Sequence, residues 1–165
     1  MTQGAETMPR SVVWLGYGGL LPFVTLALAG LLPEIKPAAQ QVLLAALLAY
    51  GAVILSFVGA LHWGFAISSG ILNARQRNAC FLWSVVPALL AWPTFFLPAR
   101  VAGAVLVIGF LAHYLQDRRL VRYAGLPQWY LPLRLRLTTV ACVCLAVPGC
   151  RAAVSSTMVN ILSQA

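Results

Sequence analysis

The chain has 165 residues, of which 61% are hydrophobic and only 8% are charged, and its formal net charge is +8. A soluble domain typically carries about 25% charged residues, so this composition excludes a protein that is solvated by water alone. The basic residues lie between apolar runs, where arginine orients helices and contacts lipid headgroups, so we expect a membrane protein with no nucleic acid partner.

The apolar runs predict a transmembrane helical bundle. A bilayer core about 30 Å thick needs roughly 20 apolar residues in each helix. We expect an all-α, multi-pass protein of about five spans that forms a single integral membrane domain over residues 1–165. The predicted spans are residues 11–32, 39–65, 80–97, 101–115 and 133–154.

The first predicted span contains a glycine cluster followed by proline. Gly16, Gly18 and Gly19 precede Pro22, whose ring clashes with the carbonyl of Gly18 and removes a backbone donor. The sequence therefore predicts a kink near Gly18.

The second predicted span carries small residues at helical spacing. Ser56, Ala60 and Gly64 recur every four residues, and Gly59 widens the smooth surface that they form. Such small-residue faces let membrane helices approach closely. We expect this face to pack against another helix.

The third predicted span contains two prolines. Pro87 and Pro93 should open the backbone at the carbonyls of Trp83 and Leu89. Broken helices can mark transport sites, but prolines are common in membrane helices and neighbouring groups often satisfy the gap. We favour structural kinks.

Residues 116–132 form the least hydrophobic part of the chain interior, and we predict a loop there. Arginines beside aromatic residues at headgroup depth are a common interfacial anchor and attract anionic lipid. The predicted headgroup contacts are Arg118, Arg119, Arg122, Trp129, Tyr130 and Arg136.

The arginines are distributed unequally between the two sides of the predicted bundle. With five spans, eight arginines share the side of the N-terminus and three basic residues lie opposite. The positive-inside rule then places the N-terminus in the cytoplasm and the C-terminus outside. The bilayer, anionic lipids within it and a membrane-protein partner are the expected binding partners.

Polar side chains gather near the cytoplasmic ends of the second, fourth and fifth spans. We predict a polar cluster of His62, Trp63, His113, Asp117 and Arg134. His113 and Asp117 are four residues apart, so they share one face of a helix. A lone carboxylate in apolar surroundings needs a partner, and a structural ion pair meets that need without catalysis.

Other chemistry at this cluster is less favoured. His62, His113 and Asp117 would supply a two-histidine, one-carboxylate metal set, but their spacing does not show that His62 meets the other two. The four cysteines form neither a CxxC pair nor a zinc spacing. We expect no catalytic residues, no metal and no cofactor.

Two segments carry a resemblance to a known family. Residues 50–64 read YGAVILSFVGALHWG, and residues 127–139 read PQWYLPLRLRLTT. They resemble the transmembrane protein 69-like family, a domain of unknown function (number 3429). The resemblance implies a compact multi-helix protein of bacterial inner membranes with mitochondrial relatives, and it implies no activity, cofactor or catalytic residue.

The absence of a catalytic set beside abundant packing features favours a non-enzymatic interaction or assembly factor for inner-membrane components. The alternative is a small carrier or a lipid- or quinone-binding protein, whose ligand lies between the kinked first and third helices near His62 and Asp117. A membrane enzyme that uses His113 and Asp117 is the least favoured hypothesis.

Overall fold

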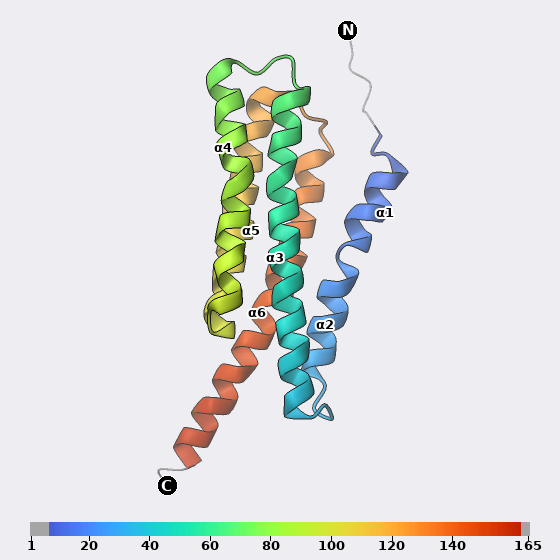
Figure 1. Cartoon of the computed structure of the whole chain (residues 1–165). Helices are drawn as coiled ribbons and strands as arrows, with labels where there is room; N and C mark the ends of the chain where they lie inside the picture. The colour runs from blue at the N-terminus through green and yellow to red at the C-terminus, as the bar shows by residue number, and fades with distance from the viewer. Residues whose placement is uncertain (1–6, 163–165) are drawn as a thin grey trace.

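The structure, a computed structural model, describes residues 7–162, and it describes side chains as far as residue 146. The described residues form helices and no strand. The helices are α1 (Arg10–Gly18), α2 (Leu21–Leu31), α3 (Pro37–Ser68), α4 (Ala74–Ala91), the short 3₁₀ helix η1 (Trp92–Phe96), α5 (Ala99–Ala124) and α6 (Tyr130–Leu162). The chain is therefore an all-α bundle, in which the α3–α4 and α5–α6 turns lie at the same end as the start of α1 (Figure 1).

Four segments within the described residues are long and apolar enough to cross a bilayer: Arg10–Leu31, Pro37–Ser68, Ala74–Phe96 and Ala99–Ala124. They cover the first four predicted spans. The fifth predicted span, residues 133–154, falls within α6, but its side chains from residue 147 onward lie outside the described residues. Crossing by this helix stays a prediction.

The first span is interrupted where the kink was predicted. α1 ends at Gly18, a turn follows at residues 19–20, and α2 resumes at Leu21. Pro22 lies in the first turn of α2, where its missing N–H costs no helical hydrogen bond. The break lets α1 lean away from α3 and α6 while α2 stays against them (Figure 1).

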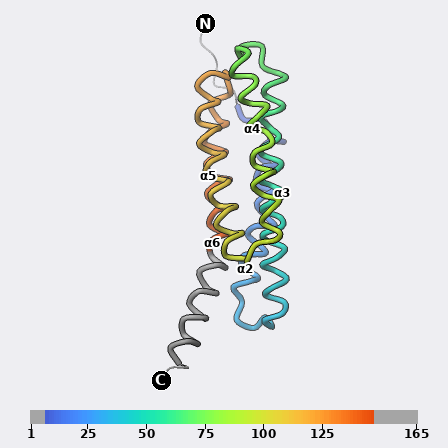
Figure 2. The backbone as a smooth tube through the Cα atoms, turned by 60° about the vertical axis from the view of Figure 1, so that its left-hand side comes forward, coloured from blue at the N-terminus to red at the C-terminus, as the bar shows by residue number. Residues whose placement is uncertain are grey.

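The two prolines of the third predicted span have different outcomes. α4 continues through Pro87 and ends at Ala91, and Pro93 lies in the first turn of η1, which begins at Trp92. At the start of α4, Asn73 and Gln76 form a reciprocal capping box that satisfies two backbone donors. α4 packs along α3 and also contacts α5 (Figure 2).

The prediction of a loop over residues 116–132 was wrong for its first half. α5 continues to Ala124 and ends at Gly125, whose φ of 61° suits a helix C-terminus. Arg118, Arg119 and Arg122 are therefore exposed helical residues. Their charges lower the hydropathy of this part of the chain. The fall in hydropathy marks where α5 leaves the apolar core, and the helix itself ends later.

A polar layer separates two apolar clusters inside the bundle. The larger cluster includes Leu55, Val58, Leu106 and Phe110, and the smaller cluster includes Ala66, Cys80, Leu120 and Ala124. Along α3 and α5, His62, His113 and Asp117 lie between the two sets and are fully buried. The layer lies toward the end of the bundle where α3 and α5 finish and α6 begins (Figure 1).

The predicted small-residue face does not pack within the chain as one surface. Gly59 is buried, and a Cβ there would lie 2.8 Å from Pro87 Cγ, so close contact between α3 and α4 requires this glycine. Ala60 and Gly64 are exposed, and a Cβ at Gly64 would meet no atom within 4 Å. Adjacent helical residues point about 100° apart, so Gly59 is buried against α4 while its neighbour Ala60 is exposed.

Candidate functional site

Asp117 is the centre of the polar layer. Arg134 Nε donates a 2.7 Å hydrogen bond to Asp117 Oδ2, and the Tyr130 hydroxyl donates to Oδ1 at 3.1 Å. Both partners come from the first turns of α6, so these bonds join α5 to α6. The carboxylate is fully buried, and the guanidinium partner meets the requirement that a buried charge be paired.

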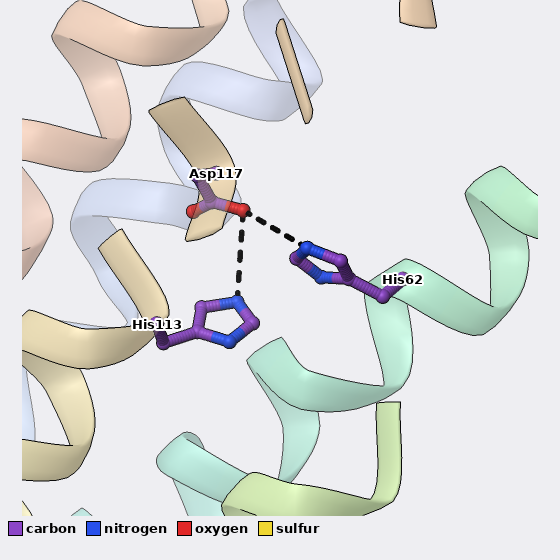
Figure 3. Close-up of side chains that lie close together, drawn as sticks. All are labelled: His62, His113 and Asp117. Carbon is purple, nitrogen blue, oxygen red and sulfur yellow. Dashed lines mark ion pairs between the residues drawn. The ribbon is translucent and has the colours of Figure 1, made fainter. Parts of the chain in front are cut away.

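Two histidines approach the same carboxylate oxygen (Figure 3). His62 Nε2 lies 3.8 Å from Asp117 Oδ1, and His113 Nε2 lies 3.7 Å from it. The two imidazole rings meet edge to face, with centroids 4.8 Å apart. The structure thus brings α3 to the pair on α5 that the sequence predicted, which spacing along the chain did not show.

Trp83 of α4 determines which nitrogen of His113 carries the proton. The indole Nε1–H of Trp83 donates to His113 Nδ1 at 3.1 Å. An indole nitrogen is only a donor, so Nδ1 must be unprotonated and neutral His113 must carry its proton on Nε2. That proton faces the Asp117 carboxylate.

The same hydrogen bond argues against a metal centre. The candidate ligand atoms of His62, His113 and Asp117 all lie within 4.8 Å of one another, which is a compact enough set. However, coordination through Nε2 of His113 would place the proton on Nδ1, directly against the donating Trp83. Arg134 already neutralises the carboxylate. The donor pattern therefore favours a hydrogen-bonded cluster around an ion pair.

Several buried polar atoms lack a hydrogen-bond partner among the described residues. They are His62 Nδ1 and Nε2, His113 Nε2, Arg134 Nη2 and Thr138 Oγ1. Most buried polar groups in proteins are paired, so these atoms are exceptions, and the two Nε2 atoms among them face the Asp117 carboxylate at 3.7–3.8 Å. Two of the residues, Arg134 and Thr138, also line a groove.

The groove lies between α1 and the body of the bundle and has a volume of about 680 Å³. α1, α3 and α6 supply most of its wall, including Leu15, Phe57 and Leu137. Its polar lining residues are Tyr130, Arg134 and Thr138, and Trp129 lines it near the α5–α6 turn. Tyr130 and Arg134 thus stand between the apolar groove and the buried Asp117 cluster.

Of the predicted polar cluster, His62, His113, Asp117 and Arg134 lie together, whereas Trp63 does not join them. Its side chain is half exposed and packs on Phe81 of α4, with ring centroids 4.8 Å apart. Trp63 follows His62 directly in α3, so it points about 100° away around the helix.

Some of the predicted headgroup contacts are exposed in the structure, and others are buried. Tyr130 is buried on Asp117 and so does not face the headgroups, which corrects that prediction. Trp129 is partly buried in the groove wall. Arg136 is exposed, and its Nη1 lies 3.3 Å from the Tyr17 hydroxyl of α1. Headgroup contact by Arg118, Arg119, Arg122 and Arg136 stays a prediction.

Sequence reasoning missed two members of the site. Trp83 was noted only for its backbone carbonyl, and nothing in its spacing connects α4 to His113. Thr138 had a usable signal, because it follows Arg134 by four residues and therefore shares its helical face.

Comparison with known sequences identifies the family. Residues 8–148 match the family described as protein of unknown function (DUF3429). The chain belongs to the DUF3429 family. This DUF3429 chain is similar to transmembrane protein 69 of Xenopus tropicalis, with 38% identity over 137 residues that cover 81% of this chain and 51% of the relative. It is also 26% identical to transmembrane protein 69 of Mus musculus over 139 residues, 84% of this chain and 55% of the relative.

This family member thus spans about half the length of each of these relatives. No solved structure matches it. Membership confirms the predicted resemblance and, with the apolar helices, an integral membrane protein. The family description gives no activity, so the function must be argued from the site.

Proposed function

We propose that this protein binds an anionic glycerophospholipid, with one acyl chain in the groove and the headgroup at the basic end of the bundle. The groove carries the proposal: an apolar space of about 680 Å³ with one cationic residue, Arg134, among the residues of its wall. Ligand sites commonly have volumes of about 300–1,000 Å³ and are mostly apolar with a few polar groups.

The charge at that end of the bundle complements a phosphate. Among the described residues there, Asp117 is the only carboxylate, and it is already paired with Arg134. The basic residues at that end are Arg10, Arg75, Arg77, Arg118, Arg119, Arg122, Arg134 and Arg136. Each arginine near a membrane surface contributes on the order of 1 kcal/mol to the attraction of anionic lipid.

The position of α1 supports entry from the bilayer. This helix contains no buried residue, and Trp14 and Leu15 are each 78% exposed. Because α1 leans away from α3 and α6 (Figure 1), a chain from the surrounding lipid meets apolar walls on both sides. The basic end would face the cytoplasm in a bacterial inner membrane, with the N-terminus inside and the C-terminus outside.

The test is lipid retention by protein purified from its native membrane in mild detergent, measured by mass spectrometry after extraction. Wild-type protein should retain an anionic phospholipid above its proportion in the membrane. Leu137→Trp fills the groove and should lose that enrichment, whereas Leu135→Trp, at an exposed position of the same helix, should keep it. Wild-type lipid that merely mirrors the membrane composition would refute the proposal.

The predicted role as an interaction or assembly factor is a second candidate. One observation favours it: Ala60 and Gly64 on α3 are exposed, so this part of the small-residue face remains open to a helix of another protein. Photocrosslinking from residue 64 in native membranes tests it. A single reproducible adduct would support this role, and crosslinks to lipid alone would oppose it.

A further inference from the structure

We infer that the groove selects its lipid by acyl-chain length, with a preference for chains of about 14 carbons over chains of about 18. This inference rests on the proposed function and adds the length of the chain that the groove takes. The observation behind it is the shape of the groove, which is open to the side at α1 and closed at the end that lies against α2.

The groove ends where α2 packs on the bundle. α1 has no buried residue, whereas α2 packs against both α3 and α6 (Figure 1). Phe23 of α2 is buried, and its ring meets that of Phe110 of α5 edge to face, with centroids 6.2 Å apart. Both rings line the groove, as do Ile54 and Ala141, which are its lining residues farthest from the α5–α6 turn on α3 and α6. These four residues form the closed end of the groove.

Tyr50 fixes the closed end in place. It precedes Ile54 by about one turn of α3, and its ring packs edge to face on Phe23 with centroids 5.0 Å apart. Its hydroxyl donates a 2.9 Å hydrogen bond to the carbonyl of Gly19, at the break between α1 and α2. One side chain therefore holds both the start of α2 and the phenylalanine at the closed end, so an acyl chain that reaches Phe23 meets side chains that are held by packing and by a hydrogen bond.

Two helices give the same length for the groove. The lining residues of α6 run from Tyr130 to Ala141 and those of α3 from Phe65 to Ile54, and the helical rise per residue makes each of these spans about 16 Å long. An extended hydrocarbon chain advances by about 1.3 Å per carbon, because its C–C bonds of about 1.5 Å alternate in direction. The groove therefore holds about 13 carbons in line. A much longer chain has to crowd the closed end or bend out beside α1.

The experiment presents lipids of different chain length to the protein in one bilayer. Purified full-length protein is placed in nanodiscs that contain equal amounts of dimyristoleoyl, dipalmitoleoyl and dioleoyl phosphatidylglycerol, together with the phosphatidylcholines that carry the same chains. A shared bilayer has one thickness for all of these lipids. Bound lipid is identified by native mass spectrometry. Because extra methylenes in a closed apolar site cause overpacking, dimyristoleoyl phosphatidylglycerol should be favoured over the dioleoyl lipid by about fivefold or more.

Two variants of one partly buried residue test the closed end in opposite directions. Ile54→Ala enlarges this end and should shift the preference toward the dioleoyl lipid, whereas Ile54→Phe fills it and should strengthen the preference for the shorter chains. The matched control is Val53→Ala, at an exposed neighbouring position of α3, which should keep the wild-type preference.

The possible outcomes separate this inference from the proposed function. If the three phosphatidylglycerols bind equally but are enriched over phosphatidylcholine, selection by length is refuted and the groove proposal stands. A preference for short chains that stays the same in both Ile54 variants would also refute the closed end as its cause. If phosphatidylglycerol is not enriched over phosphatidylcholine at any chain length, the proposed function itself fails.

Discussion

Replacing Asp117 by leucine tests whether the buried ion pair stabilises the bundle. The change leaves the Arg134 guanidinium buried without its carboxylate, and it removes the acceptor of the Tyr130 hydroxyl. Breaking one side of a buried pair costs about 3–5 kcal/mol in soluble proteins. Polar groups of a membrane protein also find partners in the unfolded, membrane-bound chain, which lowers the net cost. We therefore expect a loss of about 3 kcal/mol in the free energy of unfolding.

The assay is denaturant unfolding in mixed micelles of wild type, Asp117→Leu, Arg134→Leu and the double variant. An apolar pair of similar volume often replaces a buried ion pair with little loss, so the double variant should recover at least half of the Asp117→Leu deficit. A loss below about 1 kcal/mol for Asp117→Leu would refute a buried, paired charge. Strictly additive losses would show that the two side chains do not interact.

Two other contacts give sharper local tests. Gly59→Ala should lower stability by about 1–3 kcal/mol, because its Cβ would lie 2.8 Å from a proline carbon of α4, whereas Gly64→Ala should change it little in the same unfolding assay. Nitrogen-15 NMR of the imidazoles should show His113 protonated on Nε2 in wild type, and Trp83→Phe should release that preference. Trp92→Phe, at an exposed indole, is the control, and an Nδ1–H tautomer in wild type would contradict the hydrogen bond to Trp83.

Hydropathy and proline chemistry were sufficient to predict the helical class, the first four spans and the break near Gly18. These features depend on local physics, namely the thickness of a bilayer and the missing donor of Pro22. The end of α5 was missed for a related reason. Hydropathy reports where a helix leaves the apolar core, and α5 continues past that point to Gly125.

The site was only partly predictable, because its members come from different helices. Spacing placed His113 beside Asp117, but only packing shows that His62 of α3 reaches the same oxygen and that Trp83 of α4 sets the tautomer. Trp63 shows the opposite error. Its place next to His62 in the sequence suggested that it joins the cluster, but its side chain is half exposed and points elsewhere. These outcomes depend on the direction in which each side chain points around its helix axis and on how the helices pack. The spacing of residues along a single sequence does not give that packing.

Arg134 connects the ion pair to the groove, which gives the two parts of the site different mutational signatures. Its Nε holds Asp117 while the residue also lines the groove, so the ion pair fixes the position of this part of the groove wall. Asp117→Leu should therefore reduce both stability and lipid enrichment. Leu137→Trp adds bulk in the open groove and leaves the ion pair intact, so it should reduce enrichment while stability changes little. Equal effects of both variants on both measurements would mean that the groove is only a packing defect of the fold.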